Sequence, residues 1–183
     1  MINYKETYEK VFDIPHYSKN RDRKVSCQLV HDYLSGDEKS AIDIGSGRGP
    51  VLLELLTKFQ SSQILSCDLK KFHDLEVPFR VLDLTVKADR DSILLDFPVF
   101  DFLTCMDVLE HVEKKELDNI LIFFKLIAKK YLIVVANHSD VWGEELHLIQ
   151  EPMDWWEDKL TKYFSILKKK SIHSNRAYVF YIE

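Results

Sequence analysis

The sequence contains few of the residues that mark fibrous, disordered or cross-linked proteins. Its 183 residues include only five glycines, five prolines and three cysteines. So little glycine and proline, with hydrophobic residues at 46%, excludes collagen-like and low-complexity chains. Cys27, Cys67 and Cys105 are odd in number and lack a CxxC spacing, so we expect neither a disulfide framework nor a thiolate zinc site. A reducing cytoplasm is the expected location.

Long apolar runs and an excess of positive charge are also lacking. The most apolar stretches are interrupted by Asp96, Asp101 and Lys125, whereas a membrane-spanning helix needs about 20 mostly apolar residues. The first residues carry Lys and Glu where a secretory signal has its apolar core. Because 25 Lys and Arg stand against 30 Asp and Glu, giving a net charge of −5, duplex DNA is not an expected partner. We expect no membrane partner either.

Short β-type runs alternate with helical patterns from Ser40 onward, which is typical of a parallel sheet with crossover helices. The length suits a single domain over residues 1–183, with a helical N-terminal cap (1–39) and a core (40–183). A terminal antiparallel hairpin is expected to complete the sheet. The predicted strands are 41–44, 63–67, 79–82, 100–106, 131–136, 165–172 and 178–182, and the predicted core helices are 51–59, 115–130 and 152–164.

A glycine-rich turn follows the first predicted strand. Gly45, Gly47 and Gly49 stand at alternate positions between strand and helix, so a ligand can approach the backbone without meeting a Cβ atom. The dinucleotide fingerprint GxGxxG has its third glycine where this chain has Pro50, which disfavours NAD or FAD. Asp43 precedes the turn and would repel a pyrophosphate but attract a cationic ligand. The turn therefore favours a nucleotide-like ligand that carries positive charge.

These residues resemble the first motif of the class I S-adenosylmethionine-dependent methyltransferases, an acid followed by GxGxG. The resemblance implies a Rossmann-like three-layer α/β/α sandwich with a seven-stranded, mostly parallel sheet and an antiparallel last strand. It further implies that Asp68 binds the ribose hydroxyls, that Asp83 lies near the adenine amino group, and that Cys105 and Met106 lie along the methionine moiety. The cofactor-binding residues that it implies are Asp43, Gly45, Ser46, Gly47, Gly49, Asp68, Leu69, Asp83, Leu84, Cys105 and Met106.

Histidines beyond the carboxyl ends of predicted strands are candidates for proton transfer. Methyl transfer needs alignment first, and a base only when the attacking group is a hydroxyl or a protonated amine. His111, His138 and His147 all lie at that edge of the predicted sheet. His147 is the preferred base and His111 the next. The alternative is that both bond to loop backbone and shape the pocket.

A second interpretation treats Asp107, Glu110, His111 and His147 as ligands of a hard metal ion, because they mix oxygen and nitrogen donors. This set resembles the magnesium-dependent small-RNA 2′-O-methyltransferases of the Hen1 type, which use a Glu-x-x-Glu-His motif, although the first position here is Asp107. The main interpretation assigns no metal.

The main prediction is therefore a cytoplasmic enzyme that transfers a methyl group from S-adenosylmethionine to an oxygen or nitrogen of a small molecule or sugar acceptor. A compact acceptor is favoured because the motifs leave no separate recognition domain. A Hen1-like RNA methyltransferase is the first alternative. The second is a non-catalytic methyltransferase-like subunit that binds a partner through Trp155 and Trp156. The oligomeric state stays open.

Overall fold

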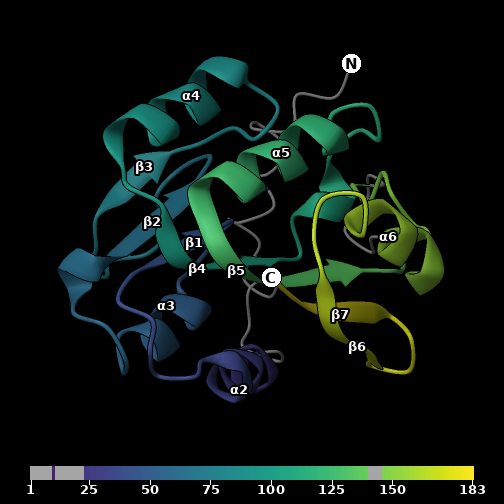
Figure 1. Ribbon diagram of the computed structural model, residues 1–183, viewed down its shortest axis with the longest axis horizontal. Coiled ribbons are helices and arrows are strands. Elements are labelled where there is room, and N and C mark those ends of the chain that lie inside the picture. Colours follow the sequence, from purple (N-terminus) through teal and green to yellow (C-terminus); the bar gives the residue numbers. More distant parts are fainter. Residues whose placement is uncertain (1–9, 11–22, 140–145) are drawn as a thin grey trace.

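The computed structural model describes residue 10, residues 23–139 and residues 146–183 (Figure 1). Its helices and strands, in chain order, are α2 (Arg23–Tyr33), β1 (Ala41–Ile44), α3 (Pro50–Leu55), η1 (Ser61–Gln63), β2 (Ile64–Asp68), β3 (Phe79–Val81), α4 (Lys87–Asp96), β4 (Phe100–Met106), η2 (Leu109–His111), α5 (Leu117–Ile127), β5 (Ala128–Ala136), α6 (Met153–Leu160), β6 (Ile166–Ile172) and β7 (Ala177–Ile182).

One seven-stranded sheet forms the centre of the molecule, in the order β3-β2-β1-β4-β5-β7-β6. Strands β1 to β5 pair in parallel, and β7 runs antiparallel to both of its neighbours. Asp43 on β1 lies beside Ser66 on β2 and Thr104 on β4, so these strands end together. We call this end of the sheet the carboxyl edge; it is where open α/β sheets bind ligands. The mostly parallel sheet with an antiparallel last strand is confirmed.

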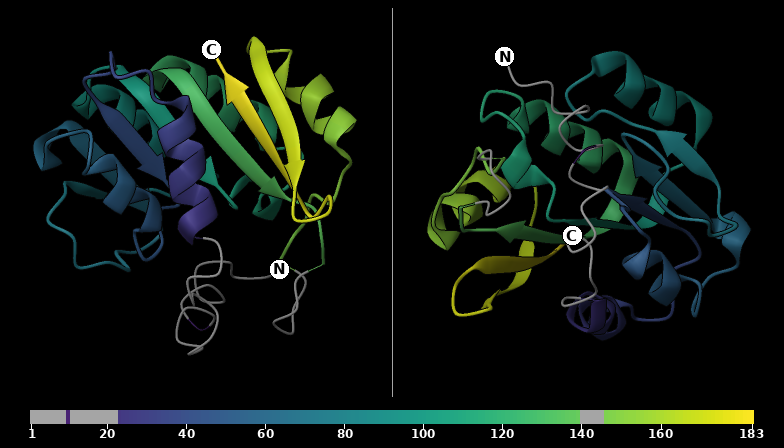
Figure 2. Two further views of the ribbon diagram at one scale, coloured as in Figure 1. Left: turned by 90° about the horizontal axis from the view of Figure 1, so that it is seen from below. Right: turned by 180° about the vertical axis from the view of Figure 1, so that it is seen from behind.

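Helices cover both faces of the sheet (Figures 1 and 2). α4, α5 and α6 lie on one face, and α2 and α3 lie on the other. Because successive strand side chains point to opposite faces, Leu103 and Ile133 pack with α5 while Phe102 and Leu132 pack with α2 and α3. The three-layer α/β/α sandwich is confirmed.

The helix predicted for residues 115–130 is shorter in the structure. α5 ends at Ile127, and β5 begins at Ala128, three residues before the predicted strand. Lys129 and Lys130 therefore lie in β5, where they form ion pairs with carboxylates, and do not stabilise the end of the helix. Lysines are favoured in the last turn of a helix, so Lys129 and Lys130 led the sequence pattern to place the end of the helix too late.

The predicted N-terminal cap is described only from its second half. α2 lies on the face of the sheet, where the Tyr33 ring contacts Phe102 and Tyr181. Leu29 is buried, and Val25 and Leu34 are half-buried against the same core. The helix expected before Pro15 lies outside the described residues. None of the helices in the described ranges has the length and apolar character needed to cross a membrane.

The connection between the neighbouring parallel strands β2 and β3 contains no helix. Residues 69–78 form a loop, although parallel strands are usually joined through a helix. His73 and Val77 are its buried residues. This loop packs beneath the glycine turn and becomes part of the candidate site.

Candidate functional site

The glycine turn links β1 to α3 at the carboxyl edge. Gly45, Gly47 and Gly49 have positive φ angles of 76°, 50° and 80°, a region that other residues rarely adopt. The backbone N–H groups of Gly45 and Ser46 both donate to the carbonyl oxygen of Cys67, at 2.8 and 3.2 Å. These bonds fix the turn to the end of β2.

Two of these glycines have no room for a side chain. A Cβ atom on Gly45 would lie 2.2 Å from Cγ2 of Val108, and one on Gly49 would lie 2.8 Å from Cδ1 of Leu75. Val108 lies two residues before Glu110, in the segment that follows β4. The turn therefore packs directly on the segment that carries the second half of the site.

Asp68 lies at the end of β2 and holds the glycine turn. Its Oδ2 accepts a hydrogen bond from the backbone N–H of Gly47 at 2.8 Å, and its Oδ1 accepts one from Leu69 at 2.7 Å. Burial raises the pKa of this carboxyl, against the opposing effect of the two bonds. A carboxylate offers about four acceptor positions, so Asp68 keeps capacity for ligand hydroxyls.

Asp43 is buried at the end of β1 beneath the turn. Its Oδ1 accepts a hydrogen bond from the Thr104 hydroxyl at 2.7 Å, whereas Oδ2 has no hydrogen-bond partner among the described residues. Burial raises its pKa to about 7, and the nearby charge of Asp68 raises it further. A cation near this carboxyl would compensate its buried charge, which supports the preference for a positively charged ligand.

A buried hydrogen-bond chain supports the turn from below. The Ser66 hydroxyl donates to the Ser46 hydroxyl at 2.8 Å, and Nε2 of His73 lies 2.9 Å from Ser66 Oγ. Hydroxyl groups both donate and accept, so the direction of the second bond depends on the tautomer of His73. Burial lowers the pKa of His73, in keeping with a neutral imidazole.

The remaining cofactor candidates follow β3 or lie at the end of β4, and their environments differ. Asp83 follows β3 and accepts two hydrogen bonds from Thr85, from its N–H at 2.9 Å and its hydroxyl at 2.7 Å. Leu84 and Cys105 are buried in the core, and Met106 is half-buried at the end of β4. Cys105 has no exposed surface, so it can support a ligand site only by packing under the residues that line it.

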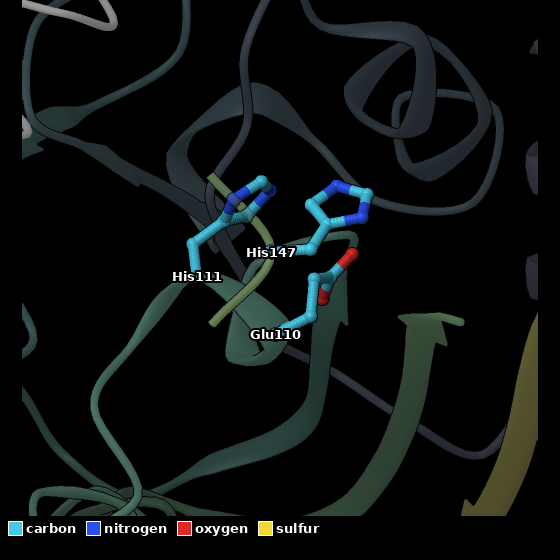
Figure 3. A group of neighbouring side chains, drawn as sticks. All are labelled: Glu110, His111 and His147. Atoms are coloured by element: carbon cyan, nitrogen blue, oxygen red, sulfur yellow. The ribbon is translucent and has the colours of Figure 1, made fainter. Parts of the chain in front are cut away.

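Glu110, His111 and His147 converge at the carboxyl edge (Figure 3). One ligand atom from each lies within 4.8 Å of the other two. We call these three residues the cation cluster. His147 is brought there by two hydrogen bonds between segments far apart in the chain. Ile149 N–H donates to the Glu110 carbonyl at 3.0 Å, and Nδ1 of His111 lies 3.0 Å from the Leu146 carbonyl.

Backbone carbonyls set the tautomers of both histidines. Nδ1 of His111 faces the carbonyl oxygen of Leu146 at 3.0 Å, and Nδ1 of His147 faces that of His138 at 2.6 Å. A carbonyl oxygen only accepts, so Nδ1 carries a proton in each ring, and Nε2 is the nitrogen that a metal ion would bind. This arrangement is typical of metal-binding histidines, whose second nitrogen donates to a backbone carbonyl or a carboxylate.

Glu110 is the most buried member of the cation cluster. Its Oε1 accepts a hydrogen bond from the backbone N–H of Ala136 at 3.0 Å, and its Oε2 has no hydrogen-bond partner among the described residues. Burial raises the pKa of Glu110 well above its usual range, and the charge of Asp107 raises it further. A carboxylate with two imidazoles is a donor set that suits a divalent transition metal.

The structure does not bring every candidate into the cation cluster. Asp107, the fourth proposed ligand, is exposed and adopts a φ angle of 54°, and it is not among the three described residues that converge. The His138 ring packs edge to face on His147, with ring centroids 4.9 Å apart, but also lies outside the group. His138 contributes through its carbonyl oxygen.

The two tryptophans have different environments. Trp156 has no exposed surface and packs in the core, whereas Trp155 is half-buried, with Nζ of Lys114 5.3 Å from its ring centroid. Only Trp155 therefore has surface available for an acceptor or a partner.

Sequence reasoning missed four polar residues that support the site, namely Ser66 and His73 beneath the turn, Thr104 and Asn137. Thr104 is buried and donates to Asp43; its only signal is a hydroxyl within an apolar strand. Asn137 follows β5 and bonds to the Tyr178 hydroxyl and to the Arg176 carbonyl. Its signal is a polar residue at the carboxyl end of a predicted strand.

Known structures share the fold of this chain. An O-methyltransferase family protein from Burkholderia thailandensis matches with a TM-score of 0.64 at 16% identity, over 96% of this chain and 62% of that one. An S-adenosylmethionine-dependent methyltransferase from Clostridium acetobutylicum matches with 0.66 at 13%, over 99% of both chains. The methyltransferase domain of bacterial CtHen1-CN matches with 0.63 at 17%, over 89% of this chain and 99% of that one.

No protein-family model matches the sequence, and no curated protein matches it. Identities of 13–17% relate the chains through their architecture. The chain therefore has the class I methyltransferase fold, as its glycine turn and acids predicted.

Proposed function

We propose that the chain binds S-adenosylmethionine at the glycine turn and transfers its methyl group to a hydroxyl oxygen, with a divalent cation held by Glu110, His111 and His147. The observation that carries this proposal is the packing of Gly45 against Val108, two residues before Glu110. This packing places a turn that suits a positively charged nucleotide-like ligand beside three residues that suit a metal ion.

The cofactor is assigned to residues at the ends of β1 to β4. Gly45, Gly47 and Gly49 would let the backbone approach the ligand, and Asp68 would accept hydrogen bonds from the ribose hydroxyls. Asp43 would balance the positive charge of the methionine moiety. Asp83 is assigned to the adenine end. The flanking residues assigned to the cofactor are Ser46, Leu69, Leu84, Cys105 and Met106.

The cation cluster fits a divalent cation because Glu110 Oε2 is buried without a hydrogen-bond partner among the described residues, and one potential ligand atom from each of the three side chains lies within 4.8 Å of the other two. A bound divalent cation would act as a Lewis acid and lower the pKa of a nearby hydroxyl. The role of the three side chains is to hold and orient that charge next to the glycine turn.

This assignment changes the role expected for the histidines. His147 and His111 were predicted as proton acceptors, but a lone pair that binds a cation is not available to accept a proton. In the transfer itself, a carbon–oxygen bond forms as the carbon–sulfur bond breaks, S-adenosylhomocysteine leaves, and the hydroxyl proton passes to solvent. Alignment of the two reactants contributes about 7–11 kcal/mol to such a step.

The acceptor class has two candidates. The first is a sugar hydroxyl on a small molecule or glycan building block, which is the acceptor class expected from the sequence. A ribose 2′-hydroxyl of RNA is favoured by the cation cluster together with the likeness to the CtHen1-CN methyltransferase domain. Both candidates present a hydroxyl to the same edge of the sheet.

Two measurements test the proposal. At 100 times its dissociation constant, S-adenosylhomocysteine should stabilise the fold by about 2.7 kcal/mol, which raises the melting temperature by roughly 5–11 °C at this size. Asp68→Ala should remove that shift. Labelled S-adenosylmethionine is then offered with monosaccharides, nucleotide sugars and single-stranded RNA, and the labelled product identifies the acceptor class.

The outcomes separate the alternatives. Absence of any melting shift would overturn the cofactor assignment. A shift without transfer to any acceptor would favour the non-catalytic subunit. Label on RNA alone would favour the Hen1-like alternative over a small acceptor.

A further inference from the structure

The end of β5 and the residues just after it contact the cation cluster at two points. The backbone N–H of Ala136 donates to Oε1 of Glu110 at 3.0 Å. The carbonyl oxygen of His138 accepts the Nδ1 proton of His147 at 2.6 Å. Two members of the cation cluster are therefore oriented by backbone groups that stand on either side of a single residue, Asn137.

Asn137 joins the backbone that follows β5 to the start of β7 through two hydrogen bonds. Its N–H donates to the carbonyl oxygen of Arg176 at 2.6 Å, and its side-chain Nδ2 donates to the Tyr178 hydroxyl, also at 2.6 Å. The ladder between β5 and β7 ends at the pair Ala136 and Ala177, so Asn137 is the first residue beyond it. Among the described hydrogen bonds, the one to Tyr178 joins residues 137–139 to β7, and the one to Arg176 joins them to the residue just before that strand.

The hydrogen bond to Tyr178 lies in a protected place. Tyr178 is 6% exposed and belongs to the same core as Ile149, which bonds to the Glu110 backbone. Asn137 is half-buried. A side-chain hydrogen bond shielded from water holds its geometry better than an exposed one. Through this hydrogen bond, the side-chain amide of Asn137 holds the neighbouring His138 carbonyl in a fixed position relative to β7.

We propose that Asn137, through its hydrogen bond to Tyr178, is a positioning residue that fixes the orientation and tautomer of His147 and the orientation of Glu110. The inference rests on the proposed function, because these two side chains are assigned there to the cation. Outer residues that orient metal ligands typically change metal affinity by about 10–100-fold when they are removed. Asn137 acts one step further out, through the backbone on each side of it.

A purely structural role makes a different prediction. If Asn137 and Tyr178 only closed the end of the sheet, their loss would lower the free energy of unfolding and leave His147 in the same tautomer. If they position His147, the folded variants lose the bond to the His138 carbonyl, and the imidazole proton distributes between Nδ1 and Nε2.

The experiment is a double-mutant cycle in the full chain with Asn137→Ala, Tyr178→Phe and the double variant. Tyr178→Phe keeps the buried ring and removes only the hydroxyl, so the fold is retained. Tyr181→Phe is the matched control, because Tyr181 is also buried in β7 and its ring lies at the other end of the strand, against Tyr33. Mn²⁺ affinity is measured by electron paramagnetic resonance, and the His147 tautomer by ¹⁵N NMR, with His147→Gln used for assignment.

We expect each single variant to bind Mn²⁺ about 10–100-fold more weakly, the double variant to lose no more than either single variant, and Tyr181→Phe to bind as the wild type does. Wild-type affinity in both single variants would overturn the inference, as would losses that add in the double variant. If the wild type itself binds no Mn²⁺, the cation assignment fails, and the NMR measurement still decides the role of Asn137. An unchanged Nδ1–H tautomer in both variants would then overturn it.

Discussion

Val108 packs so closely against Gly45 that the glycine turn and the cation cluster form one unit. Gly45 has no room for a Cβ atom, because Cγ2 of Val108 would lie 2.2 Å away. The position of the turn and the position of η2, which carries Glu110 and His111, are therefore coupled. A substitution in the glycine turn should alter the position of η2, and a substitution in η2 should alter the turn.

Gly45→Ala should disturb both ligand sites. The added methyl group meets Val108 and also forces alanine to a φ angle of 76°, so we expect a loss of about 2–4 kcal/mol in unfolding free energy. Cofactor affinity should fall at least about tenfold, or 1.4 kcal/mol. Denaturant unfolding and titration with S-adenosylhomocysteine measure the two effects.

Gly36→Ala provides the matched control. Gly36 also has a positive φ angle, of 91°, but a Cβ atom there would meet nothing within 4 Å. Its cost should be that of backbone strain alone, about 1–2 kcal/mol, with cofactor affinity unchanged. Equal effects of the two substitutions on affinity would contradict the coupling through Val108.

Cofactor binding should strengthen as pH rises. Asp43 has a pKa of about 7 in the folded chain, and the positive charge of S-adenosylmethionine favours its ionised form. If binding requires that form, affinity should be roughly eightfold weaker at pH 6 than at pH 7.5. Asp43→Asn should bind more weakly at pH 7.5 and lose this dependence. A wild-type affinity that is flat over this range would contradict the role of Asp43.

The same carboxyl should make the unliganded fold less stable as pH rises. The folded pKa of Asp43, about 7, lies above the ordinary value of 3.8, so the folded state keeps a proton that the unfolded chain releases. Its contribution to unfolding free energy therefore falls between about pH 4 and pH 7. Asp43→Asn should flatten this part of the curve, as measured by urea unfolding at fixed pH values.

His147 and His138 should respond differently to replacement by alanine. His147→Ala removes a proposed ligand, so Mn²⁺ affinity should fall by at least about 100-fold. His138→Ala keeps the backbone carbonyl that orients His147, so affinity should stay within about threefold. Calorimetric titration of both variants measures this, and a larger loss in His138→Ala would reverse the assignment.

The two adjacent tryptophans should differ in their effect on stability. Trp156→Ala empties a fully buried site and should cost about 3–5 kcal/mol. Trp155→Ala, at a half-buried site beside Lys114, should cost about 1 kcal/mol. Urea unfolding compares the two. Similar losses would show that Trp155 is also a core residue and would weaken any role in partner binding.

Much of the fold was predictable because its signals are local. Alternation of strand and helix patterns predicted a mostly parallel sheet, and the three glycines with the acid two residues before them predicted the position of the turn, whereas helix α4 was not predicted. The boundary at Ile127 was not predictable, since Lys129 and Lys130 follow an apolar helical stretch as they would at the end of a helix, although they lie in β5. The missing helix between β2 and β3 was not predictable either, because loop residues 69–78 pack through tertiary contacts beneath Gly49.

The site was predictable only in part, for the same physical reason. His111 and His147 were identified from their places after strands, but their tautomers depend on the carbonyls of Leu146 and His138, which only the folded chain brings near. The part played by Asn137 depends on its pairing with Tyr178 across two strands. Such long-range hydrogen bonds leave no periodic signal in a sequence.

The measurement that tests the central claim most directly is methyl transfer from labelled S-adenosylmethionine after treatment with EDTA and again after addition of Mn²⁺. Glu110→Gln keeps the shape of the buried side chain and removes its charge. The wild type should lose activity with EDTA and regain it with Mn²⁺, whereas Glu110→Gln should stay at least about 100-fold less active under both conditions. Full wild-type activity in EDTA, or wild-type activity in Glu110→Gln, would contradict a cation-assisted transfer.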